Sequence, residues 1–486
     1  TLTDGNGHFL LSYIHDDWRV SQNLTVNLGL MYQLGTRPYD STDRLGNLWV
    51  HRDASGQVVG DLMWATTNPQ PDPVTGRRNE PARTFGFGRA LIQNDYNDLA
   101  PRAGVAYKLG SKTVIRSGFG VFYNSTFVQE LQDLRKFWPF TVQQVFSPNR
   151  GALDLSITDP GPSFESTAAI GGWPQNPENR SPYSMQWNLF LQRQLMNDLS
   201  LDIGYVGSGS RKQIGYSPFN NALTPGPGPI DPRRLLPQFS DLDGGSNQYN
   251  GSYNSLQVTL SKRYSNGLQF NTNYTWQKSL DGQSSLAESQ KTQNPFDRRQ
   301  DYSRSSWDIN HVFNFSYLYE LPIGKGRKWG ASWVKAADLV LGGWSLEGIT
   351  RLESGPPFNV SLGTDRANTG RSTQRPNLVG DPNAGPKTVD EWFNTKAFVL
   401  PAQYTFGNAG AYITNADGII GIDMALEKKF PIRESHAVEF RTEFFNVPNT
   451  VSFGDPTGAM NNANFGKITT QRTSPRQIQF GLRYRF

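Results

Sequence analysis

One short stretch of the sequence has residue types that could bind a metal ion. Residues 241–247 read Asp-Leu-Asp-Gly-Gly-Ser-Asn, which places the oxygen donors of Asp241, Asp243 and Asn247 around a glycine pair. Hard oxygen ligands at alternate positions are typical of calcium loops, but such a loop ends in a bidentate glutamate that this stretch lacks. We interpret it as a Gly/Asn-rich turn, with a metal site on these three residues as the alternative.

The rest of the sequence carries no catalytic signature. It has no cysteine, and its five histidines lack the H-E-x-x-H spacing of a metal site. It has no G-x-S-x-G, and the Gly118/Gly120 pair is not followed by a helical pattern. We therefore expect a protein that is not an enzyme and that needs no cofactor.

Charged residues near the C-terminus recur at every second position. They are Glu427, Lys429, Glu439, Arg441, Glu443, Arg483 and Arg485. On strands, this spacing places each group of charges on one face. They could line a solute path or hold a plug domain by ion pairs. The interpretation we favour for any single residue is a solvated wall whose opposite charges pair across strands.

The elements that must carry these residues are strands, because apolar and polar residues alternate along much of the chain. In 477–486, Ile478, Phe480, Leu482, Tyr484 and Phe486 alternate with glutamine, glycine and arginine. The same period of two occurs in 24–34, 256–261, 268–277 and 438–444. One face of each strand is thus apolar and the other polar.

Composition points to a membrane β-barrel. Aromatic residues make up 12% of the 486 residues, and 48 glycines and 31 prolines disfavour helices. No apolar run reaches the roughly 20 residues that a membrane helix needs. A barrel strand needs only about 10 residues with one apolar face. The net charge of +5 is small and its Lys and Arg are dispersed, so we expect no nucleic-acid partner.

We predict thirteen strands and an all-β, transmembrane antiparallel barrel. The ranges are 8–18, 22–34, 101–109, 112–123, 183–195, 198–208, 253–264, 267–278, 309–320, 342–353, 420–430, 435–446 and 476–486. Aromatic residues such as Trp18, Tyr123, Tyr264 and Trp276 fall near the predicted strand ends, as in membrane-interface girdles.

The connections alternate between short and long. Short links lie at 21–23, 110–111, 196–197, 265–266 and 431–434, and long segments at 35–100, 124–182, 209–252, 279–308, 354–419 and 447–475. Outer-membrane barrels have short periplasmic turns and long extracellular loops, which predicts a periplasmic C-terminus. Residues 321–341 break this rule, since they should be periplasmic but are long, and we expect a short helix around 331–341. An odd strand count that begins outside implies at least one further strand upstream.

The last ten residues, Gln477 to Phe486, are predicted to be the closing strand of the barrel. Phe486, Tyr484 and Leu482 share its apolar face and resemble the C-terminal signal that the barrel-assembly machinery recognises. An ordinary strand that happens to end in phenylalanine is the alternative. Chain ends normally fray, so an aromatic terminus within a strand favours the signal.

Several ordered stretches resemble TonB-dependent outer-membrane transporters, specifically the Oar-like barrel. They are 16–20, 99–104, 114–123, 186–189, 204–208, 274–280, 342–344, 392–395, 406–410, 440–446 and 474–477, for example Phe-Arg-Thr-Glu-Phe-Phe-Asn at 440–446. Together they cover nearly the whole chain. The resemblance implies a barrel of about 22 strands, an internal plug, an N-terminal regulatory-like β-domain, and a TonB complex that supplies energy. The sequence contains neither the plug nor the TonB-contacting segment, so the resemblance covers a C-terminal part of such a barrel.

The function that this predicts is TonB-dependent uptake or passage of a large solute across the outer membrane of a Gram-negative bacterium. Loops rich in Pro, Gly, Asn and Tyr suit the binding of a carbohydrate, a peptide or a chelate, and they suit rigid loop packing equally. Expected partners are outer-membrane lipid, the barrel-assembly machinery, TonB through the plug-bearing part, and the solute. A passive porin or protein-secretion conduit is one alternative, and an extracellular β-rich adhesin is another.

Overall fold

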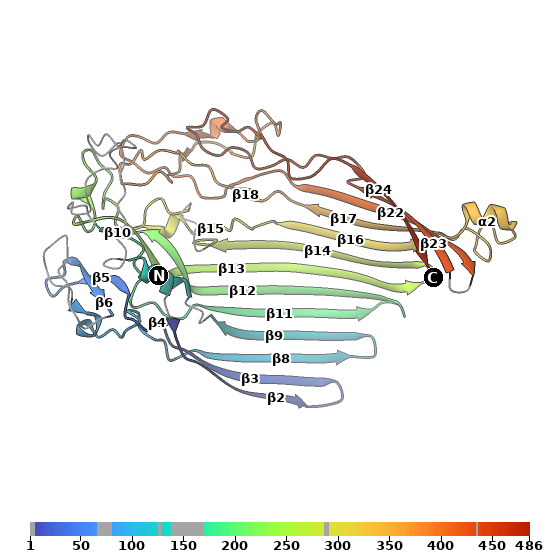
Figure 1. Ribbon diagram of the computed structural model, residues 1–486, viewed down its shortest axis with the longest axis horizontal. Coiled ribbons are helices and arrows are strands. Elements are labelled where there is room, and N and C mark those ends of the chain that lie inside the picture. The colour runs from blue at the N-terminus through green and yellow to red at the C-terminus, as the bar shows by residue number, and fades with distance from the viewer. Residues whose placement is uncertain (1–4, 66–79, 125–127, 138–169, 286–290, 434–435) are drawn as a thin grey trace.

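The protein is all-β, and its main feature is one large antiparallel sheet (Figure 1). The computed structural model describes residues 5–65, 80–124, 128–137, 170–285, 291–433 and 436–486. Thirteen described strands follow one another across the sheet in chain order. They are β2 (Phe9–Arg19), β3 (Leu24–Gly35), β8 (Leu99–Leu109), β9 (Thr113–Tyr123), β11 (Tyr183–Gln194), β12 (Leu199–Pro218), β13 (Phe239–Ser265), β14 (Leu268–Asp281), β16 (His311–Glu320), β17 (Trp344–Glu353), β22 (Ile419–Arg433), β23 (His436–Phe445) and β24 (Gln477–Arg485).

These strands confirm the thirteen that the alternation predicts. Most bounds agree within a few residues, but β12 runs to Pro218 rather than 208, and β13 begins at Phe239 rather than 253. The two strands continue to pair beyond the alternating region, for example Tyr216 with Gly245, although β-bulges shift the register between Ser210 and Gly215. The predicted turn at 241–247 is therefore wrong. Pairing with a distant segment keeps these residues extended.

The register joins the apolar residues of successive strands into one continuous face. Leu256 lies opposite Trp276, Val258 opposite Tyr274, and Phe440 opposite Leu482. Large side chains on this face stay exposed, including Trp276 at 56%, Phe480 at 70% and Leu482 at 76%. An apolar surface of this extent is not stable in water. It has the chemistry of a barrel wall against lipid.

The opposite face of the same strands is polar. The Thr259 hydroxyl donates to Asn273 Oδ1 at 2.9 Å, and the Ser261 hydroxyl donates to Asn271 Oδ1 at 2.8 Å. Both contacts join directly opposite residues of β13 and β14. Such pairs stabilise a sheet by roughly 0.2–1 kcal/mol each.

One end of the sheet, the short-turn end, carries the tight connections. Asn266 and Gly267 form the turn between β13 and β14 with φ of 50° and 78°, as a two-residue hairpin requires. Residues 434–435 of the predicted link between β22 and β23 lie outside the described part of the chain. The long connection between β16 and β17 holds the expected helix, α2 (Lys335–Leu341), which extends past the strand ends (Figure 1).

The opposite, long-loop end carries a folded cap built from the long connections. Parts of 35–100, 124–182 and 279–308 lie outside the described residues. The remaining small elements of the structure are β1 (Gly5–Asn6), β4 (Tyr39–Asp40), β5 (Gly46–Arg52), β6 (Val58–Trp64), β7 (Glu80–Pro81), β10 (Ile170–Gly172), β15 (Ser303–Arg304), β18 (Pro357–Phe358), β19 (Asn377–Leu378), β20 (Phe398–Val399), β21 (Thr414–Asn415), the helix α1 (Val128–Arg135) and 3-10 turns at Ala82–Phe85, Asp231–Arg233, Arg298–Gln300 and Thr395–Ala397.

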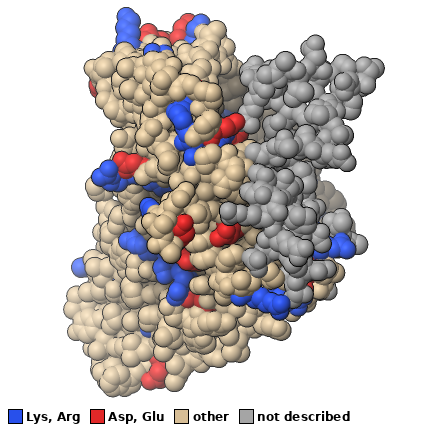
Figure 2. All heavy atoms as spheres, turned by 90° about the vertical axis from the view of Figure 1, so that its left-hand side faces the viewer, with Lys and Arg blue, Asp and Glu red and all other residues tan. Residues whose placement is uncertain are grey.

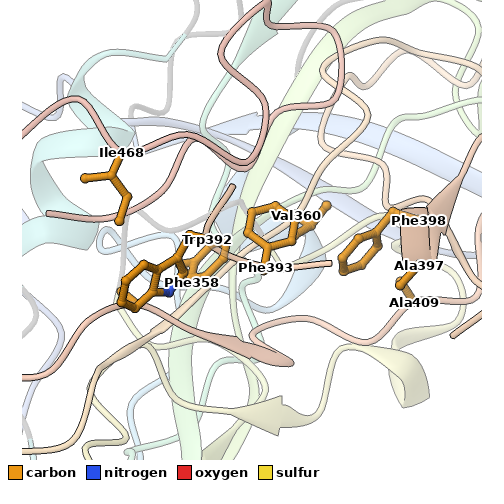
Figure 3. Close-up of a cluster of buried hydrophobic side chains, with 9 residues drawn as sticks. Phe358, Val360, Trp392, Phe393, Ala397, Phe398, Ala409 and Ile468 are labelled. Atoms are coloured by element: carbon orange, nitrogen blue, oxygen red, sulfur yellow. The ribbon is translucent and has the colours of Figure 1, made fainter. Parts of the chain in front are cut away.

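The cap has hydrophobic cores of its own. Leu48, Trp64 and Phe239 belong to one buried cluster, which joins β5 and β6 to the start of β13. A second cluster surrounds Phe393, whose ring centroid lies 5.2 Å from that of Phe358 and 5.8 Å from that of Phe398 (Figure 3). These loops therefore pack as folded structure.

The sheet is open in the described part of the chain. β2 and β24 are its two edges, and each pairs along one side only. The prediction that β24 closes the barrel is thus confirmed for the strand but not for the closure. No helix among the described residues is long and apolar enough to cross a membrane.

Candidate ligand-binding cavity and charged wall

A cavity of about 430 Å³ lies at the long-loop end of the polar face. Strands β12, β13 and β14 supply one wall, and α1 with the 282–308 connection supplies the rest. The cavity lining includes Ser208, Ser210, Tyr253, Ser279, Asp281, Glu130, Tyr249, Ser284, Ser305 and Trp307. A concave site with a few convergent polar groups is a typical ligand pocket.

Strand register explains why the wall residues converge. Tyr253 of β13 lies opposite Ser208 of β12 and Ser279 of β14, so the three project from one face in a row. The Tyr253 hydroxyl donates to Gln277 Oε1 at 2.7 Å, which fixes its ring on the polar face. The next row holds Ser210, Gly251 and Asp281. The wall therefore presents hydroxyls around one aromatic ring.

Both carboxylates at the cavity are already paired. Arg37 Nη1 lies 2.6 Å from Glu130 Oε2, and both side chains are almost fully buried. Arg37 also donates to the Asn179 carbonyl at 2.7 Å. Burial raises the pKa of Glu130, and the Arg37 guanidinium opposes that rise. Lys291 Nζ contacts Asp281 Oδ1, and the lysine side chain is buried. The charges offset one another, so the cavity offers mainly hydroxyl, amide and ring groups.

Two aromatic residues add to these groups. Trp307 is 62% exposed and lines the cavity from the 282–308 connection. Tyr249 lies in the extended part of β13 with the Arg298 guanidinium 5.0 Å from its ring centre. The buried Tyr249 hydroxyl has no hydrogen-bond partner within the described residues. A ligand oxygen or a water could complete that hydrogen bond.

The charged residues predicted from the sequence meet on the polar face of β17, β22, β23 and β24. Arg441 lies at their centre, with Nη1 2.7 Å from Glu347 and 3.0 Å from Glu427, and Nε 2.9 Å from Glu443. Glu439 pairs with Lys429 at 3.1 Å and with Arg485 at 3.3 Å, and Arg483 is its register partner. The predicted cross-strand pairing is confirmed. Exposed pairs of this kind contribute about 0–1 kcal/mol each.

The three candidate metal ligands point to different partners. Asp241 pairs with Arg234 at 2.7 Å, and Asp243 pairs with Arg371 at 2.8 Å. The Asn247 side-chain amide donates to the Arg180 carbonyl at 3.2 Å. Burial raises the pKa of Asp243, against the opposing charge of Arg371. The described residues hold no group of three or more His, Cys, Asp or Glu side chains that could share a metal ion. These aspartates instead tie β13 to the cap.

The candidate assembly signal lies on the exposed edge strand. Leu482, Tyr484 and Phe486 are 76%, 54% and 89% exposed. The rings of Tyr484 and Phe486 stack at a centroid distance of 6.1 Å, and Tyr484 hydrogen-bonds His436 at 2.7 Å. An accessible aromatic row at a sheet edge is what recognition by another protein needs. The signal itself stays a prediction.

The cavity was not predicted from the sequence, although two of its residues stand out in the sequence pattern. Tyr253 is the first residue of a predicted strand and falls on its polar side, where an aromatic residue is unexpected. Ser208 lies at the end of another predicted strand. Trp307 reaches the cavity from a loop, Tyr249 from the extended part of β13, and Gln129 from the helix α1. Their placement depends on long-range packing, which no local pattern reveals.

Comparison with protein families shows which family the chain belongs to. The sequence matches the family described as outer membrane beta barrel domain over residues 3–479. The chain belongs to this family. An outer-membrane β-barrel accounts for the continuous apolar face, the polar opposite face and the alternation of short and long connections. Curated proteins give no match to the sequence.

Solved outer-membrane proteins resemble this barrel chain at low identity. The outer membrane transporter YddB from Escherichia coli is 10% identical with a TM-score of 0.49, over 98% of this chain and 53% of its own. The ferric-catecholate import receptor Fiu from K12 E. coli is 11% identical with a TM-score of 0.43, over 99% and 44%. FpvA of P. aeruginosa, bound to heterologous pyoverdines, is 10% identical with a TM-score of 0.47, over 100% and 39%. The chain thus spans about half or less of these structures.

Proposed function

We propose that this chain is part of the barrel of an outer-membrane transporter that takes up a large solute with energy from TonB. The main observation behind the proposal is that the large sheet has one apolar face and one polar face. The apolar face contacts lipid, the polar face lines an aqueous lumen, and the cap with its cavity lies at the outer mouth. Under this orientation the short-turn end and the C-terminus face the periplasm.

The open edges support a larger barrel. In hydrocarbon, an unpaired strand edge leaves backbone N–H and C=O groups without partners, at several kcal/mol each. β2 and β24 both run from the long-loop end to the short-turn end, so direct pairing of the two would be parallel. An all-antiparallel barrel therefore requires an odd number of further strands between them. Those strands, and a plug inside the lumen, would come from other parts of the transporter.

The cavity favours a neutral, polar solute such as a carbohydrate or a peptide over an anionic chelate. Its two carboxylates are paired, and serine hydroxyls, tyrosines and Trp307 line it. Viewed from the long-loop end, the described surface is mostly uncharged, with Lys/Arg and Asp/Glu scattered on it (Figure 2). Aromatic rings beside hydroxyl and amide groups suit sugar or peptide binding.

Uptake in cells tests the proposal. We expect that deletion of TonB in the source organism abolishes solute uptake by the intact protein, whereas unchanged uptake would contradict it. The alternative is a passive porin or secretion conduit, which an open polar face also permits. In planar bilayers, a large steady conductance of the intact protein would favour that alternative, and a closed channel would favour the plugged transporter.

A further inference from the structure

The connection between β16 and β17, residues 321–343, has an unusual surface for a turn. Its Val334, Leu339, Val340 and Leu341 are 72%, 49%, 64% and 53% exposed, and Trp329 is 55% exposed. Periplasmic turns of outer-membrane barrels are short, whereas this connection is long enough to hold the helix α2. Exposed apolar side chains on an ordered segment mark a contact with another apolar phase.

The charges of this segment are one-sided. It contains three lysines and one arginine but a single acidic residue, Asp338. The Asp338 carboxylate accepts the Lys325 backbone N–H at 2.6 Å, so it is used within the segment. Arg327 pairs with Glu320 at 2.8 Å. Lys325, Lys328 and Lys335 are exposed and form no ion pair within the described part of the chain. They are therefore available to an anionic surface.

Lys428 ties the C-terminal end of this segment to the apolar face of the sheet, whereas Lys335 and Leu339 line a cavity with the polar-face residue Glu347. In the register of β17, β22 and β23, Lys428 lies between Trp344 and Phe440, on the apolar face, yet it is only 2% exposed. Its ammonium donates to the carbonyls of Gly342 and Val340, just at the end of α2. The Trp344 indole also donates to the Val340 carbonyl, at 3.1 Å. A lysine on the lipid side is thus covered by the C-terminal end of the helix.

We propose that segment 321–343 is a membrane anchor that lies in the headgroup layer beside the barrel and binds anionic phospholipid. Val334, Val340 and Leu341 enter the acyl boundary, Trp329 occupies the interface, and the exposed lysines contact lipid phosphates. Interfacial helices combine these features, and each basic residue near an anionic leaflet adds to the attraction. The segment lies at the end of the sheet opposite the cap (Figure 1).

This inference rests on the proposed orientation of the apolar face, so its test separates the two. The chain has no cysteine, and a single Val340→Cys can carry a spin label in nanodiscs. Leu256→Cys, in the middle of the wall, serves as the lipid control, and Leu400→Cys, exposed in the cap, as the water control. Collision with oxygen and with a water-soluble nickel chelate reports the depth of each label.

We expect the Val340→Cys label to be several-fold more accessible to oxygen than to nickel, as at Leu256→Cys and opposite to Leu400→Cys. Adding phosphatidylglycerol to phosphatidylcholine nanodiscs should increase its depth, and replacing Lys325, Lys328 and Lys335 by glutamine should remove that increase. A water-exposed label at 340 with a lipid-exposed label at 256 overturns the anchor and leaves the barrel orientation intact. A water-exposed label at 256 overturns the orientation, and with it the anchor.

Discussion

At the scale of single residues, the polar face is a wall of compensated charges. Arg441 contacts three glutamates, and Glu439 contacts two cations. The cap has a similar ion pair in a buried place, where Nη1 and Nη2 of Arg375 each lie 3.1 Å from Asp301 Oδ1. Exposed and buried pairs differ in what their loss costs, because only the buried groups lack water as a substitute partner.

Replacing Arg441 by glutamine should lower the free energy of unfolding by about 1–2 kcal/mol, since three partly exposed pairs are lost and the glutamates repel. Denaturant titration of the protein in detergent, followed by tryptophan fluorescence, measures this. Arg351→Gln is the matched control, because Arg351 shares the face but pairs, among the described residues, with Glu353 alone. Its loss should stay below about 0.5 kcal/mol. Equal losses in the two variants would contradict the central role of Arg441.

The titration of Asp301 should make the cap more stable in mild acid than at neutral pH. Burial raises the pKa of Asp301 from 3.8 to about 6, against the opposing charge of Arg375. The folded cap therefore binds the proton more tightly than the unfolded chain. This contribution is full below about pH 4 and is lost as the pH rises through about 6.

Denaturant midpoints of the cap at pH 4.5 and pH 7.5, read by a fluorophore at Leu400→Cys, check the sign. Asp301→Asn should reduce the difference between the two midpoints, because an amide does not titrate. Asp297→Asn, at a partly exposed site, is the control, since the Arg299 contacts lower the pKa of Asp297 to about 2, below this pH window. A difference that Asp301→Asn leaves unchanged would assign the effect to other groups.

At the scale of elements, the alternation of apolar and polar residues predicted the strands of the sheet but little of the structure of the cap. Strand β24 was predictable because a period of two from Ile478 to Tyr484 has one interpretation. The stretch from Asp241 to Asn247 was not, because glycines and aspartates favour turns locally and only pairing with β12 extends them. Phe393 and Trp392 carry no periodic signal, since their core forms between loops distant in sequence. The cavity is lined both by strands of the sheet and by segments of the cap. Only the strands could be predicted from the sequence.

We expect Phe393 to contribute strongly to the stability of the part of the cap that is built around its buried cluster. It is fully buried among Phe358, Phe398 and Phe465. Phe393→Ala should cost about 3–5 kcal/mol of local stability through lost contacts and a cavity. Faster proteolysis within 354–418, with unchanged far-ultraviolet dichroism of the sheet, is the expected readout. Leu400→Ala, at a site 55% exposed, should behave as the native protein. Loss of the whole sheet in Phe393→Ala would show that cap and barrel do not fold separately.

At the scale of the whole molecule, the two open edges and the two faces set the architecture. Because β2 and β24 run in the same direction, we expect them to be separated by further strands in the intact transporter. A thiol cross-linker should then join Ile14→Cys to Leu30→Cys, which are register partners, but not Ile14→Cys to Leu482→Cys. Equally efficient cross-linking of both pairs in membranes would indicate that the thirteen strands close on themselves.

The central claim is that one face of the sheet contacts lipid and the other contacts water. Single cysteines along β13 test it most directly, because the chain has none of its own. With the protein in bilayers, a membrane-impermeant maleimide should label positions 257, 259 and 261 and spare 256, 258 and 260. This alternation should persist over the neighbouring β14. Uniform labelling of both sets in folded protein would contradict the membrane-spanning wall.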